Sequence, residues 1–337
     1  MKKLITFSII PTILLLSGCS SKKYFDPDKS YSIKEAKSSF KGKIISTNRN
    51  GATFKSGQYL TKSGDGVLNL GEGYIYINST AQYIIASNKS GNLKLINKNS
   101  KETLRVIGLQ APVITATVNN DLVVYLLEDN SFGVYRISNN LKVFESKSER
   151  VFAIDTRVAN PIFSNNKVIL PTLDGKILIF NPKDKDSIRT MYISSQQKFN
   201  GAIYLSKIGN KIITASAHAV MTIENGMENR LRVELSEILI ENGSIYIFTK
   251  SGDIIKTDLN LNKVASINFE YIHYSLVGAD NNKIYALDYK GSLVVVDSTL
   301  TKSKVYNFDD VDTNSFISGN KLFKKSKVVN LDRLNYE

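Results

Sequence analysis

Residues 283–297 read Lys-Ile-Tyr-Ala-Leu-Asp-Tyr-Lys-Gly-Ser-Leu-Val-Val-Val-Asp, and this stretch is the strongest indication of the fold. The apolar run 283–287 is followed by a polar turn at Lys290-Gly291 and by a second apolar run, 293–296. A glycine turn between two short runs rich in β-branched and aromatic residues predicts a β-hairpin. The second run is apolar at consecutive positions, so we expect both faces of its strand to be buried between neighbouring sheets.

The same unit recurs along the chain with a period of about 40 residues. Such a period is typical of β-propellers, in which each repeat forms one four-stranded blade. No stretch after residue 19 has a helical pattern of useful length. The sequence therefore predicts an all-β chain folded as an eight-bladed β-propeller of four-stranded antiparallel blades, with seven blades as the alternative. The eight hairpins are expected at residues 43–54, 83–96, 122–137, 167–180, 211–223, 244–255, 283–296 and 321–329.

The last hairpin ends close to the C-terminus, with too few residues left to complete its blade. An open ring would leave sheet edges with unpaired backbone groups. We therefore expect a segment within residues 31–40 to supply the missing strand and close the ring. The propeller domain is assigned to residues 31–337, and the polar stretch 19–30 is assigned as a flexible tether.

Residues 1–18 have the pattern of a signal peptide, with a positive start at residues 1–3 and an apolar run at 4–16. The sequence Leu16-Ser17-Gly18-Cys19 resembles the lipobox of bacterial lipoproteins. This resemblance implies cleavage before Cys19, which becomes an N-palmitoyl, S-diacylglycerol cysteine that holds the chain at a membrane. Ser20 is not the Asp of an inner-membrane retention signal, which implies the outer membrane, facing the periplasm, if the organism is Gram-negative. The alternative is an uncleaved anchor helix with a chance cysteine.

The chain is basic, since 44 Lys and Arg against 31 Asp and Glu give a formal net charge of +13. A basic surface attracts anionic headgroups, polyanionic glycans or acidic proteins. The lysines are scattered rather than clustered, which favours a solvated surface, and an exported lipoprotein is not expected to have a nucleic-acid partner. A surface lipoprotein that binds a glycan, another polyanion or a ligand is the alternative function. Cys19 is the only cysteine, so disulfides are excluded.

The hairpins at 167–180 and 283–297 resemble the repeats of quinoprotein-like propellers, also called PQQ-like repeats. Together with the lipobox, this makes the chain similar to the BamB family of outer-membrane-protein assembly lipoproteins. The resemblance implies a scaffold that contacts the β-barrel assembly machinery and helps to insert barrel proteins. The chain has no Trp, whereas quinone-dependent dehydrogenases of this repeat type have a Trp beneath the cofactor. Asp310-Val311-Asp312-Thr313 resembles a stretch of the BamB family, but it precedes the last hairpin, so no role is transferred to it.

Candidate catalytic and metal-binding residues are few. His218 and His273 are isolated, without metal-ligand spacing, and we interpret them as turn or surface residues. Residues 309–312 lack the spaced ligands and glycine of a calcium loop, and we interpret them as a solvated acidic turn. We therefore expect a non-enzymatic, monomeric propeller without cofactor or metal, which binds cell-envelope proteins through its loops or blade edges. A divergent enzyme is the remaining alternative.

Overall fold

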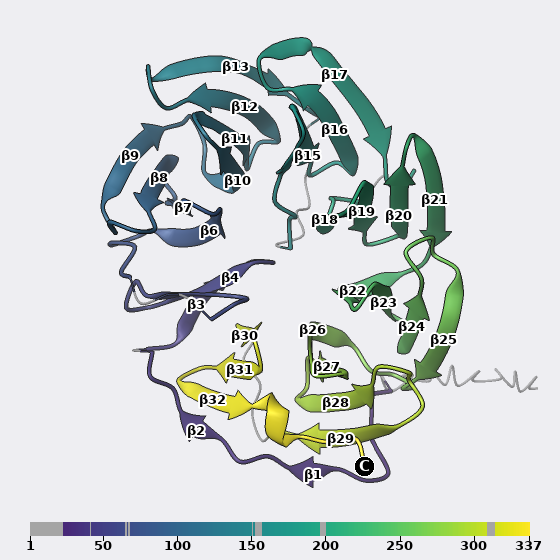
Figure 1. Ribbon diagram of the computed structural model, residues 1–337. Coiled ribbons are helices and arrows are strands. Elements are labelled where there is room, and N and C mark those ends of the chain that lie inside the picture. The colour runs from purple at the N-terminus through teal and green to yellow at the C-terminus, as the bar shows by residue number, and fades with distance from the viewer. Residues whose placement is uncertain are drawn as a thin grey trace, which may run out of the picture.

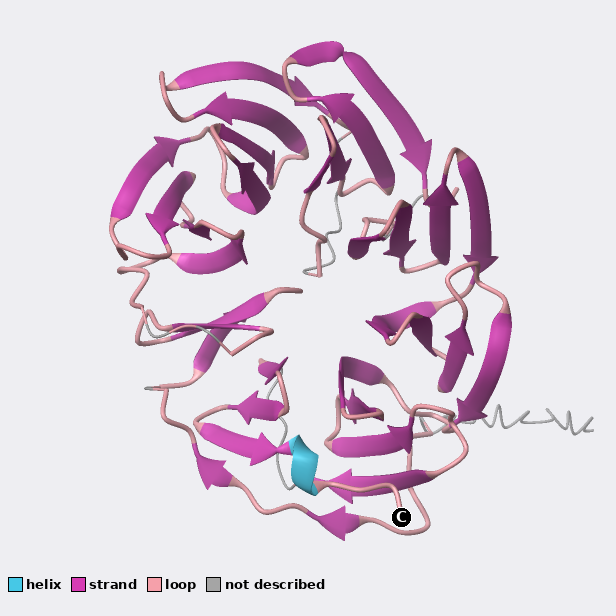
Figure 2. Ribbon diagram, viewed as in Figure 1, coloured by secondary structure: helices cyan, strands magenta, loops and turns pink. Residues whose placement is uncertain are grey.

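The computed structural model describes residues 23–337 except 41, 65, 67, 150, 152–156, 196–199 and 309–313. The described chain is all-β, and its sheets are arranged as the eight blades of a closed propeller (Figure 1). Loops and turns join the strands, and one turn of 3-10 helix, Leu331–Arg333, follows the last strand (Figure 2). The prediction of an eight-bladed propeller is confirmed.

Five consecutive blades have four antiparallel strands each, in simple up-and-down order. Their innermost strands lie nearest the ring centre, and the fourth strand of each lies on the outer rim (Figure 1). In chain order their strands are β6 (Ile75–Ser79), β7 (Tyr83–Ser87), β8 (Asn92–Asn97), β9 (Thr103–Gly108); β10 (Val113–Asn119), β11 (Leu122–Leu127), β12 (Ser131–Arg136), β13 (Leu141–Lys147); β14 (Ile162–Ser164), β15 (Lys167–Pro171), β16 (Lys176–Asn181), β17 (Asp184–Tyr192); β18 (Tyr204–Ile208), β19 (Lys211–Ser216), β20 (Ala219–Glu224), β21 (Met227–Arg232); β22 (Leu235–Glu241), β23 (Ser244–Thr249), β24 (Asp253–Thr257) and β25 (Lys263–Asn268).

The other three blades depart from this pattern in the number of their strands or in the order in which the chain supplies them. One contains β26 (Tyr274–Asp280), β27 (Lys283–Asp288), β28 (Ser292–Asp297) and β29 (Ser303–Asn307), and it gains β1 (Tyr31–Ser32) as a fifth strand. The last contains β30 (Ser315–Ser318), β31 (Lys321–Lys324), β32 (Lys327–Asn330) and β2 (Ala36–Lys37). In the first, the described residues form three strands, β3 (Ile44–Thr47), β4 (Gly51–Phe54) and β5 (Tyr59–Thr61).

The predicted hairpins are the paired strands β3–β4, β7–β8, β11–β12, β15–β16, β19–β20, β23–β24, β27–β28 and β31–β32. In the hairpin that begins at Lys283, Tyr285 faces Val295 and Ala286 faces Val294. Gly291 ends its turn at φ 112°, a value that side chains with a Cβ rarely adopt. The run Val294 to Val296 is completely buried, because its two faces pack against the two neighbouring blades.

The core lies between the blades, because each apolar cluster combines strands of adjacent sheets. One cluster joins Phe248 of β23 to Tyr274 of β26, whose ring centroids lie 5.3 Å apart. The next cluster joins Leu293 of β28 to Leu322 of β31. A blade removed from the ring would expose both of its apolar faces, so the propeller is stable only as a closed assembly.

The N-terminal segment closes the ring, as the sequence predicts. Strand β2 pairs antiparallel with β32 and becomes the fourth strand of the last blade. Phe40 then stacks on Phe54 of the first blade at 4.5 Å and contacts Phe323 of the last blade edge-on at 5.6 Å. The parallel pairing of β1 with β29, in which Tyr31 faces Tyr306, is an addition that the sequence did not predict.

Part of the stretch assigned as tether contacts the ring. Phe25 meets Phe269 edge-on at 6.1 Å, and the ammonium group of Lys290 lies 2.8 Å from the ring centroid of Tyr24. Cys19 and the predicted signal peptide 1–18 lie outside the described residues, as do residues 309–312. None of the helices in the described part of the chain is long and apolar enough to cross a membrane.

Candidate functional site

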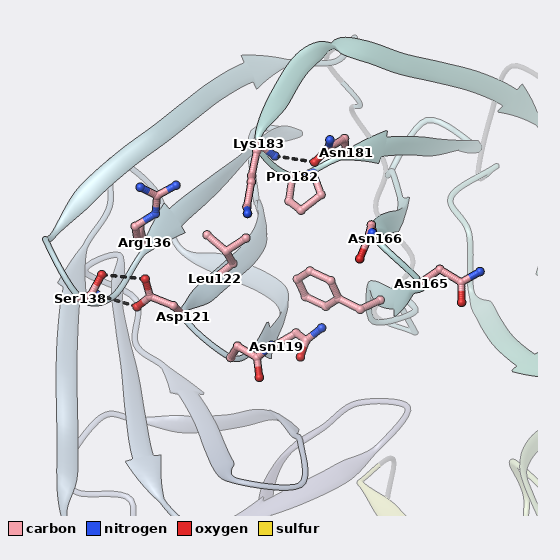
Figure 3. Close-up of a pocket in the computed structure, with 12 residues that line it drawn as sticks. Asn119, Asp121, Leu122, Arg136, Ser138, Asn165, Asn166, Asn181, Pro182 and Lys183 are labelled. Carbon is pink, nitrogen blue, oxygen red and sulfur yellow. Dashed lines mark hydrogen bonds between the residues drawn. The ribbon is translucent and has the colours of Figure 1, made fainter.

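A polar cleft lies between two blades, β10–β13 and β14–β17 (Figure 3). It has a volume of about 720 Å³, and the turns that follow β10, β12, β14 and β16 form its walls. Asp121 is fixed in it, because its carboxylate accepts bonds of 2.7 Å from both the backbone N–H and the hydroxyl of Ser138. The rest of the lining is mainly amides and two cations, namely Asn119, Asn120, Asn165, Asn166, Asn181, Arg136 and Lys183.

A second cavity, of about 660 Å³, opens at the centre of the ring. We call it the central cavity, because the inner strands β6, β10, β14 and β18 contribute to its lining. It shares the lining residues Asn119 and Phe163 with the polar cleft, so the two hollows adjoin each other. Its other polar lining includes Arg49, Asn50 and Lys62 from the three-stranded blade.

The hairpin β3–β4 carries Arg49 into the ring, and Asn48 fixes the shape of its turn. The Asn48 side-chain oxygen accepts bonds of 2.9 Å from the backbone N–H groups of Asn50 and Gly51. Its amide nitrogen donates to the carbonyl of Tyr76 at 2.7 Å, which ties the turn to β6. Asparagine favours this position because its side chain readily bonds to the backbone two residues further on.

Arg49 spans the ring to reach residues far away in the sequence. Its Nη1 lies 2.9 Å from Oε2 of Glu237 on β22, and its Nε donates to the carbonyl of Ile203 at 2.8 Å. Arg157 approaches the other side of the same carboxylate, with Nη1 3.1 Å from Oε1. The side chain of Glu237 is 6% exposed and that of Arg49 is 9% exposed, so this ion pair is almost completely shielded from solvent. A buried carboxylate needs such paired cations, because removing a charge from water is costly.

Lys62 adds a third cation to this centre. Its side chain is exposed to the water of the cavity, yet the ring surrounds it. This enclosure, together with the positive charge of Arg49, lowers the pKa of Lys62 to about 8, and Glu237 opposes the shift only weakly. The central cavity therefore combines positive charge with hydrogen-bond donors, whereas the nearby carboxylate is already held by two arginines.

The two histidines lie apart from both hollows. His218, in the turn between β19 and β20, has its Nδ1 2.9 Å from Glu234, and this bond, followed by that from Lys250, lowers the pKa of Glu234. His273 packs edge-on against Tyr289 at 5.5 Å. No group of three His, Cys, Asp or Glu side chains suited to a metal ion occurs among residues placed by the structure.

Sequence reasoning did not identify Arg49, Lys62 or Glu237. One signal was present, because Glu237 interrupts the apolar strand Leu235–Glu241 at a position that faces inward. A charged residue inside an apolar strand pattern indicates a buried polar contact. Its partner Arg49 is 188 residues away, and no local pattern connects the two.

The fold defines this chain as a β-propeller, and comparison with known proteins adds two sequence relatives. No protein-family model matches the chain. The plasminogen-binding protein PgbB of Helicobacter pylori strain J99 is 26% identical, and the match covers 94% of this chain and 67% of PgbB. PgbB of strain 26695 is 25% identical over the same shares.

Solved structures match in fold. BamB from Moraxella catarrhalis has a TM-score of 0.65 at 13% identity, covering 89% of this chain and 99% of that one. Sqt1 of Saccharomyces cerevisiae has a TM-score of 0.61 at 11% identity, with 89% and 98% covered. At these identities the likeness shows the fold alone. The resemblance to BamB thus holds for the propeller, whereas the sequence relatives are plasminogen-binding proteins.

Proposed function

We propose that this protein is a non-enzymatic scaffold that binds other proteins in the cell envelope. The observation that carries the proposal is the match to a plasminogen-binding protein across 94% of the chain. A lipid on Cys19 would hold the ring at the outer membrane, and residues 20–30 would connect the two. In this arrangement the propeller provides rigid binding surfaces, and the biological effect depends on the proteins that bind to them.

The outer rim is the surface best suited to such a partner. Strands β9, β13, β17, β21 and β25 are all edge strands, so their outer backbone groups are not paired within a sheet. In contrast, β1 and β2 cover the edges of β29 and β32. Open edges accept an extended segment of another protein by strand addition. Each open rim strand also has at least one exposed apolar side chain, namely Leu104, Val106, Leu141, Tyr192, Met227 or Val264.

Plasminogen is the first partner to test, because the two sequence relatives bear that name. We expect the full-length protein, embedded in lipid vesicles, to bind plasminogen in surface plasmon resonance but not serum albumin. Replacing Met227 and Val264 by Glu, on the rim, should weaken binding at least about tenfold, or about 1.4 kcal/mol. Ile208→Glu, which changes an exposed apolar residue of an inner strand, serves as the matched control.

The outcome separates the competing functions. Equal binding by the rim variant and the wild type would contradict the rim as the docking surface. Binding that disappears steeply with added salt and is inhibited by heparin would favour the polyanion-binding alternative.

A role in outer-membrane protein assembly is the second candidate, favoured by the fold likeness to BamB. In a Gram-negative host, loss of the protein should then lower the amount of folded barrel proteins in the outer membrane. Co-purification with the barrel-assembly machinery from crosslinked membranes tests this role directly. Unchanged barrel levels and no such co-purification would leave binding of an external protein as the function.

A further inference from the structure

The central cavity has donor groups that the described part of the chain does not satisfy. Arg49 uses Nε and Nη1, but its buried Nη2 has no hydrogen-bond partner among the residues that the structure describes. Lys62 forms no side-chain ion pair or hydrogen bond with the described residues that surround it. A buried donor without an acceptor costs about 1 to 3 kcal/mol, and more when it is charged. A charged donor in this state on a side chain that lines a cavity indicates a group that is completed by something else.

Around the cavity, positively charged side chains also outnumber negatively charged ones. Glu237 already binds both Arg49 and Arg157, so it has little capacity left for Lys62. The groups that act on the Lys62 ammonium are Arg49 from the β3–β4 turn and Glu237 from β22. In addition, the half-buried Tyr204 of β18 lines the cavity, and the Arg49 guanidinium lies 5.6 Å from its ring. A site with this surplus of positive charge, enclosed by protein, attracts an anion more strongly than the open surface does.

We propose that the central cavity is a binding site for a small oxyanion, a carboxylate or phosphate group held by Arg49 Nη2 and the ammonium of Lys62. A guanidinium edge and an ammonium are the groups that bind such oxyanions in proteins. Part of the cavity wall is apolar, formed by Ala159, Pro161, Ile162, Phe163 and Leu205. With about 660 Å³ of space, the cavity accommodates the organic body of a dicarboxylate or phosphate monoester against this wall. The inference is independent of the protein-binding function proposed above.

Titration calorimetry of the full-length protein in detergent tests the site with four probes. Succinate and phenyl phosphate represent organic oxyanions, sulfate represents an inorganic ion, and neutral succinamide is the control ligand. We expect the oxyanions to bind and succinamide not to bind. Tighter binding of succinate or phenyl phosphate than of sulfate assigns an organic ligand, and equal binding assigns an inorganic ion.

Lys62→Gln should lower the affinity at least about tenfold, because it removes one of the two binding groups. Lys183→Gln makes the same change in the neighbouring polar cleft and should leave the affinity unchanged. Arg49→Lys keeps the charge but removes Nη2, and it should also weaken binding. The wild type provides a test that needs no variant. Sulfate keeps its charge above neutral pH, whereas Lys62 loses its proton, so the affinity for sulfate should fall as the pH rises through about 8. Absence of binding by every oxyanion, or wild-type affinity in both Lys62→Gln and Arg49→Lys, would overturn the proposal.

Discussion

At the scale of single residues, Glu237 is expected to contribute strongly to stability. Its carboxylate neutralises the guanidinium groups of Arg49 and Arg157 inside the ring. Glu237→Gln keeps the size of the side chain but leaves buried positive charge uncompensated, so we expect a loss of about 3 kcal/mol in the free energy of unfolding. Urea denaturation measures this loss. Glu228→Gln, which breaks the exposed pair with Arg230, should cost less than about 1 kcal/mol, and equal losses would refute the assignment.

Lys62 gives the stability a pH dependence of defined sign. Its pKa is about 8 in the folded ring and 10.5 as the ordinary value, so between these values the unfolded chain binds more protons. Stability from this group therefore rises with pH across that window, and the full penalty of the charged form is present below about pH 8. In buffers without multivalent anions, the melting temperature of wild type relative to Lys62→Met should rise from neutral pH to about pH 10. A constant difference would contradict the lowered pKa.

At the scale of elements, the N-terminal strands are expected to hold the ring closed. Deleting residues 31–40 removes β1 and β2, and it also removes Phe40 from between the first and last blades. Each large side chain left uncovered costs roughly 1.5 to 3 kcal/mol, so uncovering about two of them should lower the free energy of unfolding by about 3 to 6 kcal/mol. Deleting residues 21–29 removes no described strand and only the half-buried Phe25 from the core, so a much smaller loss is expected. Thermal melts that show equal stability for the two deletions would mean that the ring closes without the N-terminal segment.

Some of the elements can be predicted from local sequence patterns, and others cannot. Hairpins such as 283–297 are local, because their apolar runs and glycine turns are adjacent in the chain, and these features predicted all eight blades. The strands β1 and β2 have two residues each, too short for any alternating pattern, and only the unfinished last blade indicated β2. Among the described residues, the first blade has three strands, and pairing beyond β5 is limited to one bridge between Gln58 and Asn69. The ion cluster of the central cavity depends on the closed ring, so it became visible only in the structure.

At the scale of the whole molecule, the lipid proposed on Cys19 would decide where the propeller acts. We expect Cys19→Ala to abolish incorporation of labelled fatty acid and to leave an unprocessed precursor, because the thiol is the group that the lipid transfer modifies. Since Cys19 is the only cysteine, any fatty-acid label that remained in this variant would show that the lipid is attached elsewhere. Metabolic labelling followed by gel electrophoresis provides the measurement.

The protein-binding claim is tested most directly by photo-crosslinking in intact membranes. A photoreactive residue replaces Met227 on the open edge strand β21, and in a second variant it replaces Asn307 on β29, whose edge β1 covers. We expect the first position to form an adduct with one defined protein, plasminogen when it is supplied or an envelope protein when it is not, and the second position to form none. Absence of a protein adduct at Met227 and at the equivalent rim position Val264, with the protein present and folded, would contradict the scaffold function.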